Sequence, residues 1–284
     1  MVDHAKNIPL TVPSDKQNIY LKNYERATRG KKRLFLFAGD QKIEHLHKDF
    51  YCPGVPEECA SPEHMFEIAS KSPIGVFATQ LGLIAQYGAD YNQVSYVVKL
   101  NSKTDLVPTE QKDPISLALH SVADIVQFAR QTKLSVVGVG YTVYLGSEDE
   151  FRMLTEAAQV VHQAHQHGLL AILWMYPRGA AVGDEKDSMV IAGSAGVAAC
   201  LGADFVKVNP PERVDALKQV VAAAGRTKVI CSGGKRQDES TFLRQLEEQV
   251  VVAHVAGCAV GRNIHQRELS QAVSFCEKIA KILF

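Results

Sequence analysis

Eight short apolar runs, each leading into a helix-like pattern, limit the fold of this chain more than any other feature. Each run has the length of a β-strand, and successive runs start 22 to 40 residues apart, close to the size of a strand-plus-helix unit. The runs are continuously apolar rather than alternating, which is typical of parallel strands covered on both faces. They occupy residues 33–40, 73–79, 95–101, 134–144, 169–176, 203–208, 227–234 and 257–263.

Helical patterns fill the gaps between these runs. Ser147 and Glu150 fit a capping box that opens a helix over 148–167, and Gly168 is placed to end it. Similar patterns predict further helices over 61–71, 212–224 and 265–283.

Strands that alternate with helices along the whole chain predict an α/β protein built on a single (β/α)8 TIM barrel. A doubly wound open sheet is the alternative, but no G-x-G-x-x-G sequence follows the first run, where a dinucleotide site would place it. Residues 1–32 are expected to form an N-terminal extension that caps the bottom of the barrel. No linker or low-complexity stretch interrupts the sequence, so residues 1–284 are predicted to form one domain.

The charge balance excludes several classes of function. The chain has 31 Lys and Arg against 31 Asp and Glu, so no net charge favours binding to nucleic acid or to an acidic membrane surface. Neither a bilayer-spanning apolar stretch nor a signal-peptide pattern is found. Four cysteines lie among apolar residues and are expected to be reduced core positions of a cytoplasmic protein: Cys200, Cys231, Cys258 and Cys276.

Lys207 is the most informative single residue. It lies near the end of the sixth run, and in a barrel of this kind the active site is built at the C-terminal ends of the strands. A lysine buried there has a lowered pKa, and its neutral amine is a nucleophile toward carbonyl groups. The alternative is a lysine whose ammonium reaches out from the strand end to solvent.

Glycine-containing segments end the seventh and eighth runs. Barrels of this class commonly bind phosphate at these two strand ends through backbone N–H groups, and glycines let the backbone approach the anion closely. Arg262 adds a forked cation suited to phosphate. The candidate phosphate-binding residues are Ser232, Gly233, Gly234, Gly261 and Arg262.

Large side chains alternate at the end of the fifth run. Trp174, Tyr176 and Arg178 share one face of the predicted strand, where they would line a site better than they would fill a core. The alternative is that the two aromatic rings only fill the upper layer of the barrel. Other polar residues at strand ends are Asp40, Lys99, Asn101, Tyr141 and Tyr144.

The histidines do not predict a metal site. His45 and His47 follow the first run and could approach a metal, but carboxylates and histidines do not gather at several strand ends, as a zinc site needs. His162, His165 and His167 are expected to form a solvated face near a helix C-terminus, where cations are favourable. No metal is therefore predicted.

Seven motifs combine uncommon residues across nearly the whole chain. They are GDQKIEH (39–45), VVKLNSKT (97–104), VGYTVYLGS (139–147), WMYPRG (174–179), GADFVKV (202–208), SGG (232–234) and AVGRNIHQR (259–267). Together they resemble the archaeal-type class I fructose-1,6-bisphosphate aldolases, which belong to the Schiff-base aldolases on (β/α)8 barrels.

The resemblance implies reversible cleavage of fructose 1,6-bisphosphate to dihydroxyacetone phosphate and glyceraldehyde 3-phosphate, in glycolysis and gluconeogenesis, without a metal or other cofactor. It implies that Lys207 forms the Schiff base, that Tyr176 donates and accepts protons, and that Asp40 assists. Substrate contacts are implied for Trp174, Arg178, Ser232, Gly233, Gly234, Gly261 and Arg262. A homo-oligomer built from rings, with sugar phosphates as its small-molecule partners, is also implied.

The sequence departs from the family pattern in three places. Gln41 and Lys42 follow Asp40 where the family often has His and Gly, Asn209 stands where many members have a second lysine, and His265 replaces an aromatic residue. These changes bear on the choice of aldehyde more than on the mechanism. One alternative is therefore a related Schiff-base synthase that acts on a different sugar phosphate or aldehyde.

A catalytically silent barrel that only binds sugar phosphates is a further alternative. The joint presence of Lys207, Tyr176 and Asp40 argues against it, because simple binding needs none of these residues.

Overall fold

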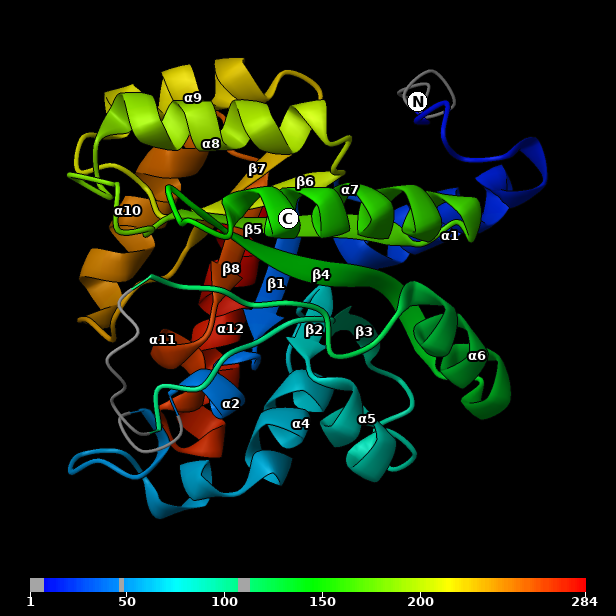
Figure 1. Cartoon of the computed structure of the whole chain (residues 1–284). Helices are drawn as coiled ribbons and strands as arrows, with labels where there is room; N and C mark the ends of the chain where they lie inside the picture. The colour runs from blue at the N-terminus through cyan, green and yellow to red at the C-terminus, as the bar shows by residue number, and fades with distance from the viewer. Residues whose placement is uncertain (1–7, 46–48, 107–112) are drawn as a thin grey trace.

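A closed barrel of eight parallel strands forms the centre of the computed structural model, which describes residues 8–45, 49–106 and 113–284 (Figure 1). Neighbours along the chain are neighbours in the barrel, and the eighth strand pairs with the first. All eight predicted strands are confirmed. They are β1 Leu34–Ala38, β2 Val76–Thr79, β3 Ser95–Lys99, β4 Ser135–Leu145, β5 Leu170–Pro177, β6 Phe205–Val208, β7 Lys228–Ser232 and β8 Gly257–Val260.

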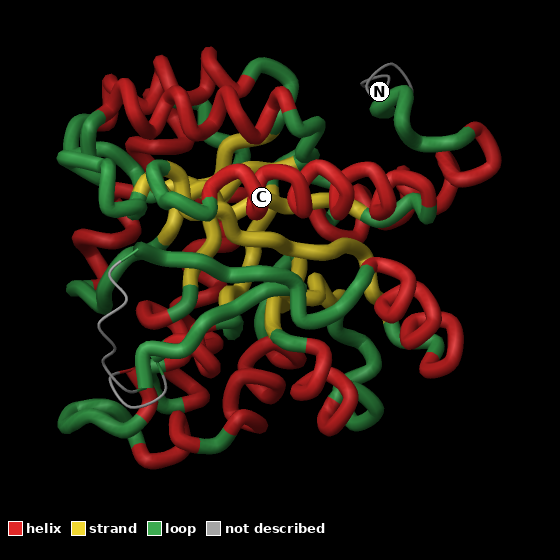
Figure 2. Tube along the Cα trace, viewed as in Figure 1, coloured by secondary structure: helices red, strands yellow, loops and turns green. Residues whose placement is uncertain are grey.

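Helices surround the barrel, as the red segments around the yellow strands in Figure 2 show. They are α1 Gln17–Thr28, α2 Gln41–Glu44, α4 Pro62–Lys71, α5 Leu81–Tyr87, α6 Val122–Thr132, α7 Glu150–Gln166, α8 Ser188–Cys200, α9 Leu217–Ala224, α10 Glu239–Val252, α11 Arg262–His265 and α12 Leu269–Leu283. Short 3-10 helices lie at Ser14–Lys16, Glu57–Ala60 and Val214–Ala216. No helix in the described ranges is both long and apolar enough to cross a membrane.

Apolar side chains cover both faces of the strands, which explains the continuous apolar runs. One buried cluster fills the barrel interior and includes Leu36, Val97, Ile172 and Ile230. A second cluster lies between the strands and the helices. Every residue of β1 is buried, so this strand could not have shown an alternating pattern.

The N-terminal extension closes the bottom of the barrel, as predicted. In α1, the Tyr20 hydroxyl donates to Asp204 Oδ1 at 2.5 Å, and the Asn23 amide donates to the Gly168 carbonyl at 2.8 Å. Asp204 also accepts from the backbone N–H of Ala171 and pairs with His165, whose Nε2 is 3.1 Å away. The expectation that His165 faces solvent is wrong, because the extension covers it completely.

Three local expectations need correction. Ser147 does not cap α7: the helix begins at Glu150, whose carboxylate accepts from the Gly146 N–H instead. The helix expected over 212–224 begins only at Leu217, after a 3-10 turn, although it does end before Gly225 as the pattern indicated. Cys200 is exposed at the end of α8, whereas the other three cysteines predicted in the core are buried.

Candidate active site

Lys207 lies at the C-terminal end of β6 and points into the barrel mouth. It pairs in register with Trp174 of β5 and Ile230 of β7 and is only 5% exposed. Burial lowers the pKa of Lys207, while Asp40 and Glu44 oppose that effect and Arg178 and Arg262 add to it. Charged residues from three other strand ends, those of β1, β5 and β8, therefore act on a single amine.

Lys99, at the end of β3, is a second buried lysine in the same space. Its Nζ donates to the Asn101 carbonyl at 2.5 Å and to the Asn101 side-chain oxygen at 3.0 Å. Burial lowers the pKa of Lys99 as well. Lys207 Nζ, by contrast, forms no hydrogen bond with any residue the structure describes, so no acceptor fixes this amine in place or favours its charged form by hydrogen bonding.

Trp174 lies between these two amines. The centroid of its ring system is 5.3 Å from Lys207 Nζ and 5.5 Å from Lys99 Nζ. The indole is buried, and it fits because Gly140 of β4 leaves space: a Cβ atom there would lie 2.4 Å from Trp174 Cζ3. Trp174 thus fills the upper barrel layer and lines the site at once.

Asp40 and Glu44 approach the lysines from one short helix. Asp40 precedes α2 and Glu44 ends it, a spacing of one helical turn that puts both carboxylates on one face. Asp40 is buried, and its Oδ1 lacks a hydrogen-bond partner among the described residues. Burial raises the pKa of Glu44 to about 7, although Lys99 opposes the shift.

Tyr176 and Arg178 follow Trp174 on β5 and its exit. The Arg178 guanidinium lies 4.6 Å from the centroid of the Tyr176 ring, and its Nε donates to Glu185 at 2.9 Å. Burial raises the pKa of Tyr176 above the ordinary phenol value, opposed by Arg178 and supported by the Asp40 carboxylate. Tyr176 is therefore protonated in the resting protein.

The ends of β7 and β8 form a single unit. The Asn263 side chain donates to the Gly233 and Lys235 carbonyls at 2.8 and 3.0 Å and accepts from the Gln237 N–H at 3.0 Å. Gly234 has a φ of 66°, a conformation that favours glycine. Asn263 thereby fixes the backbone of one glycine segment against the other.

Gly261 and Ser232 link this unit to its neighbours. A Cβ atom at Gly261 would lie 2.7 Å from the backbone carbonyl oxygen of Ala38, so glycine is needed where β8 ends beside β1. The Ser232 hydroxyl donates to the Asn209 side chain at 2.7 Å, two residues after Lys207. Arg262 lies 3.8 Å from Asp49 Oδ1, and its charge acts on both Lys207 and Tyr176.

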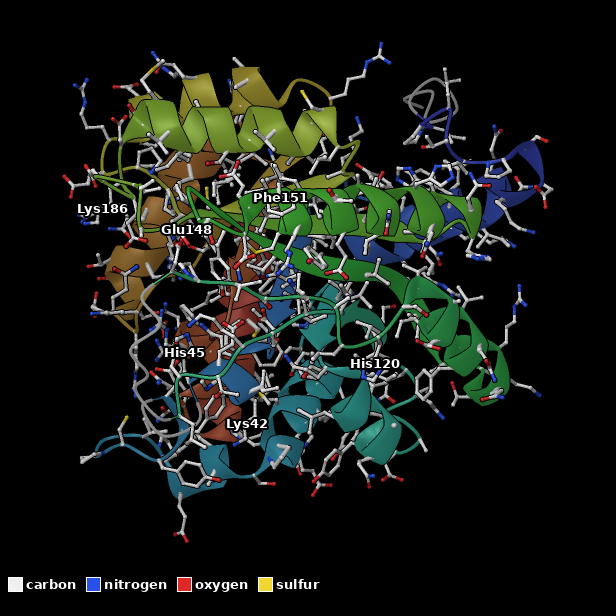
Figure 3. The ribbon with its side chains drawn as sticks, viewed as in Figure 1. Lys42, His45, His120, Glu148, Phe151 and Lys186 are labelled. Atoms are coloured by element: carbon white, nitrogen blue, oxygen red, sulfur yellow. The ribbon has the colours of Figure 1, made fainter. Side chains whose placement is uncertain are left out.

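Of the two histidines considered for a metal, the structure describes only His45, which lies beside two carboxylates. His45 lies 4.0 Å from Glu44 and 3.8 Å from Asp105, and His47 is outside the described residues. Figure 3 shows His45 and Lys42 on the lower left of the view, with Glu148 and Lys186 above them on the same side. Within the described ranges, no three potential metal ligands come together.

Two departures from the family pattern meet at one aromatic ring. Lys42 Nζ lies 4.2 Å from the Phe50 ring centroid and donates to the Ala60 carbonyl at 2.6 Å. His265 stacks on the same Phe50 ring with centroids 4.4 Å apart. Burial lowers the pKa of His265 to about 3, so its ring is neutral. These residues support the loops around the site rather than its interior.

Sequence reasoning missed two functional positions. Glu44 lies inside the quoted GDQKIEH motif, and its distance of four residues from Asp40 could have revealed it. Asn263 lies inside the quoted AVGRNIHQR motif, but its hydrogen bonds to the loop after β7 carry no sequence signal.

The fold and the site define the class of (β/α)8 aldolases that work through a Schiff base on a lysine. The sequence pattern of the DeoC/LacD aldolase family matches residues 34–267. The chain belongs to this family.

Similar proteins agree with this assignment. A protein of Methanocaldococcus jannaschii named fructose-bisphosphate aldolase/6-deoxy-5-ketofructose 1-phosphate synthase is 54% identical over 278 residues, covering 97% of this chain and 89% of the relative. A fructose-bisphosphate aldolase structure from Slackia heliotrinireducens has a TM-score of 0.94 at 50% identity and covers 97% of this chain and 89% of its own.

An archaeal fructose-1,6-bisphosphate aldolase has been solved with its catalytic lysine covalently bound to the carbinolamine intermediate of the substrate. It has a TM-score of 0.81 at 30% identity, covering 93% of this chain and 99% of its own.

Proposed function

We propose that this chain is a class I fructose-1,6-bisphosphate aldolase that cleaves its substrate reversibly to dihydroxyacetone phosphate and glyceraldehyde 3-phosphate. The observation that carries the proposal is the contrast between the two buried lysines. The Lys99 amine is held by hydrogen bonds to the carbonyl and the side-chain oxygen of Asn101. The Lys207 amine has no hydrogen-bond partner among the described residues. Burial favours the neutral, nucleophilic form of Lys207.

Lys207 begins the reaction by attack on the C2 ketone of the substrate. The resulting carbinolamine loses water and becomes an iminium. The C3–C4 bond then breaks, its electron pair moves into the iminium to give an enamine, and the C4 oxygen becomes the aldehyde. Protonation at C3 and hydrolysis release dihydroxyacetone phosphate and regenerate the amine. Asp40, which acts electrostatically on Lys207, assists proton transfer at the carbinolamine.

Tyr176 acts first as a proton donor. Because its pKa is raised, the hydroxyl is protonated when substrate arrives, and it gives that proton to the carbinolamine hydroxyl that leaves as water. The phenolate so formed is the base that takes the C4 hydroxyl proton during cleavage. One residue thus serves two successive steps.

Phosphate groups bind at both ends of the substrate. Backbone N–H groups of Ser232, Gly234 and Gly261, together with Arg262, hold the phosphate of the dihydroxyacetone half. Gly233 keeps this loop close to β8, because its own N–H donates to the Ala259 carbonyl at 3.0 Å. Arg178, which is 43% exposed, holds the phosphate on C6. Trp174 is the wall against which the substrate carbons lie.

Borohydride trapping tests the proposal. Reduction in the presence of dihydroxyacetone phosphate, followed by mass mapping, is expected to label Lys207 alone. Lys207→Met should lose both the label and cleavage activity, whereas Lys99→Met should keep the label at Lys207. A label at Lys99 or Lys235, or none in the folded wild type, would refute the assignment.

A second activity is favoured by the relative that carries two names. Dihydroxyacetone phosphate, held as an enamine on Lys207, forms a bond from its C3 to the aldehyde carbon of methylglyoxal. The aldehyde oxygen takes a proton and becomes the C4 hydroxyl, and hydrolysis releases 6-deoxy-5-ketofructose 1-phosphate. The test is to incubate the protein with dihydroxyacetone phosphate and methylglyoxal. A product that retains the phosphate and has the summed mass of the two reactants would support this activity.

The proposal extends to the protein as a whole. The iminium serves as the electron sink, so catalysis needs no metal, and full activity in EDTA is the expected result. Loss of activity in EDTA with recovery on addition of zinc would contradict the metal-free mechanism.

We also propose one domain over residues 1–284, a homo-oligomer in the cytoplasm, and a role in glycolysis and gluconeogenesis. Light scattering tests the oligomeric state.

A further inference from the structure

The end of the barrel opposite the lysines contains a large pocket. Its volume is about 960 Å³, within the range of small-molecule sites, and it lies between the N-terminal segment and the entrances of β7, β8 and β1. The pocket is on the far side of the barrel from the proposed reaction.

Positive charges surround this pocket. Lys31 and Lys32 precede β1, Arg226 precedes β7, and Lys228 is its first residue. None of these four side chains forms an ion pair or a hydrogen bond with a residue in the described part of the chain. Cations that converge without partners favour an anionic ligand.

The acidic residue in the pocket wall does not neutralise them. Asp204 is buried, and its carboxylate already accepts from Tyr20, pairs with His165 and accepts from the Ala171 N–H. It is the only carboxylate among the described residues that line the pocket. The charge of the rim therefore remains available to a ligand.

The inner wall is apolar. Ile8, Leu21, Tyr24, Val221 and Val255 line it, so the pocket offers a surface for an uncharged body as well as a charged rim. A bare inorganic ion would leave this apolar wall uncovered, whereas an amphiphilic ligand would bury it.

We propose that this pocket binds a phosphate monoester that carries an aromatic or apolar body, with the phosphate at Arg226 and Lys228. The guanidinium fork of Arg226 and the ammonium groups of the lysines that line the same pocket suit a doubly charged oxyanion. The same two strands, β7 and β8, carry the proposed substrate-phosphate site at their other ends. The two sites are thus separate and bind different ligands.

Calorimetric titration of the full-length protein tests this site, with adenosine monophosphate as the probe. Adenosine monophosphate is expected to bind, and both adenosine and inorganic phosphate to bind at least about tenfold more weakly, because each lacks one half of the recognised group. Saturating dihydroxyacetone phosphate should leave its affinity unchanged. Displacement by dihydroxyacetone phosphate would place the probe in the catalytic site and overturn the proposal.

Charge-reversal variants give the control. Arg226→Glu with Lys228→Glu should weaken probe binding at least about tenfold, and Lys31→Glu should weaken it by a smaller factor. Arg130→Glu, a similarly exposed cation on α6, should leave binding intact, and all variants should retain aldolase activity. Three results would each overturn the inference. They are an equal loss of probe affinity in Arg130→Glu, binding of inorganic phosphate as tight as that of adenosine monophosphate, and no binding at millimolar adenosine monophosphate.

Discussion

Lys99 and Lys207 approach the same indole ring of Trp174, with Nζ atoms 5.5 and 5.3 Å from its centroid. Their burial is similar, but their partners differ, since only the Lys99 amine is held by Asn101. Proximity to the barrel mouth alone would not distinguish them. The hydrogen bonds make Lys99 a fixed wall of the site and leave Lys207 as its reactive group.

Tyr176→Phe should lower turnover by about 10²–10⁴-fold, the usual contribution of a general acid–base group. The ring and its contact with Arg178 remain, so the fold and the Michaelis constant should change little. Because the raised pKa makes Tyr176 the proton donor at carbinolamine dehydration, borohydride trapping should slow together with turnover. Rapid trapping with lost turnover would restrict Tyr176 to the cleavage step.

Above about pH 7, where the Glu44 carboxylate is charged, Glu44→Gln should move the acidic limb of the kcat/KM profile to lower pH. The Glu44 carboxylate raises the pKa of Lys207, as Asp40 does, while Arg178 and Arg262 lower it. Removal of Glu44 leaves an amine that becomes neutral at lower pH, and the neutral form is the nucleophile. Glu44→Asp should keep most of the wild-type profile. An acidic limb of the kcat/KM profile that stays unchanged in Glu44→Gln would show that Glu44 does not affect the pKa of Lys207.

Glu44 should also make the stability of the protein depend on pH. A salt-bridged acid loses its stabilising effect as pH falls, whereas Glu44 should lose its effect as pH rises. The folded pKa of Glu44, about 7, lies above the reference value of 4.5, so the native state holds this proton more tightly than the unfolded chain. Wild-type stability is therefore lost as pH rises from 4.5 to 7. Denaturant titrations should show Glu44→Gln gaining stability relative to wild type across that window and remaining constant above it.

Arg178→Gln should raise the Michaelis constant for fructose 1,6-bisphosphate by at least about tenfold, since a charge-assisted contact with a phosphate is lost. Fructose 1-phosphate has no phosphate on C6, so its Michaelis constant should change much less. The ratio of the two constants is the measurement. An equal rise for both substrates would place Arg178 elsewhere on the substrate.

Asp204→Ala should lower the free energy of unfolding by about 3 kcal/mol, because it leaves buried donors of Tyr20, His165 and Ala171 unsatisfied. Turnover should change little in the protein that remains folded, since Asp204 lies at the bottom of the barrel. Asp204→Asn keeps the shape of the side chain and one acceptor oxygen, so the free energy of unfolding should fall less in this variant than in Asp204→Ala. Guanidinium titration of the three proteins gives the comparison.

Much of the barrel was readable from the sequence because its signals are local. The apolar run around Lys207 marked β6, and glycines marked the loops after β7 and β8. These features depend on residues close together in the chain, so their pattern survives without knowledge of the fold.

The missed features depend on distant partners. His165 has the spacing of a solvated helix face and becomes buried only because the N-terminal extension packs over it. Cys200 sits in an apolar helix, but its position at the end of α8 exposes it. The pKa of Glu44 likewise follows from burial in the barrel mouth, which no neighbouring residue reveals.

The long-range bonds of α1 have a consequence for how the chain folds during synthesis. Tyr20 is synthesised 184 residues before its acceptor Asp204, and Asn23 is synthesised 145 residues before the Gly168 carbonyl to which it donates. At typical translation rates this interval lasts on the order of 10 s or more. Through that time the apolar face of α1 has no barrel to cover, so α1 is synthesised before the strands that it contacts and reaches its native place only after them.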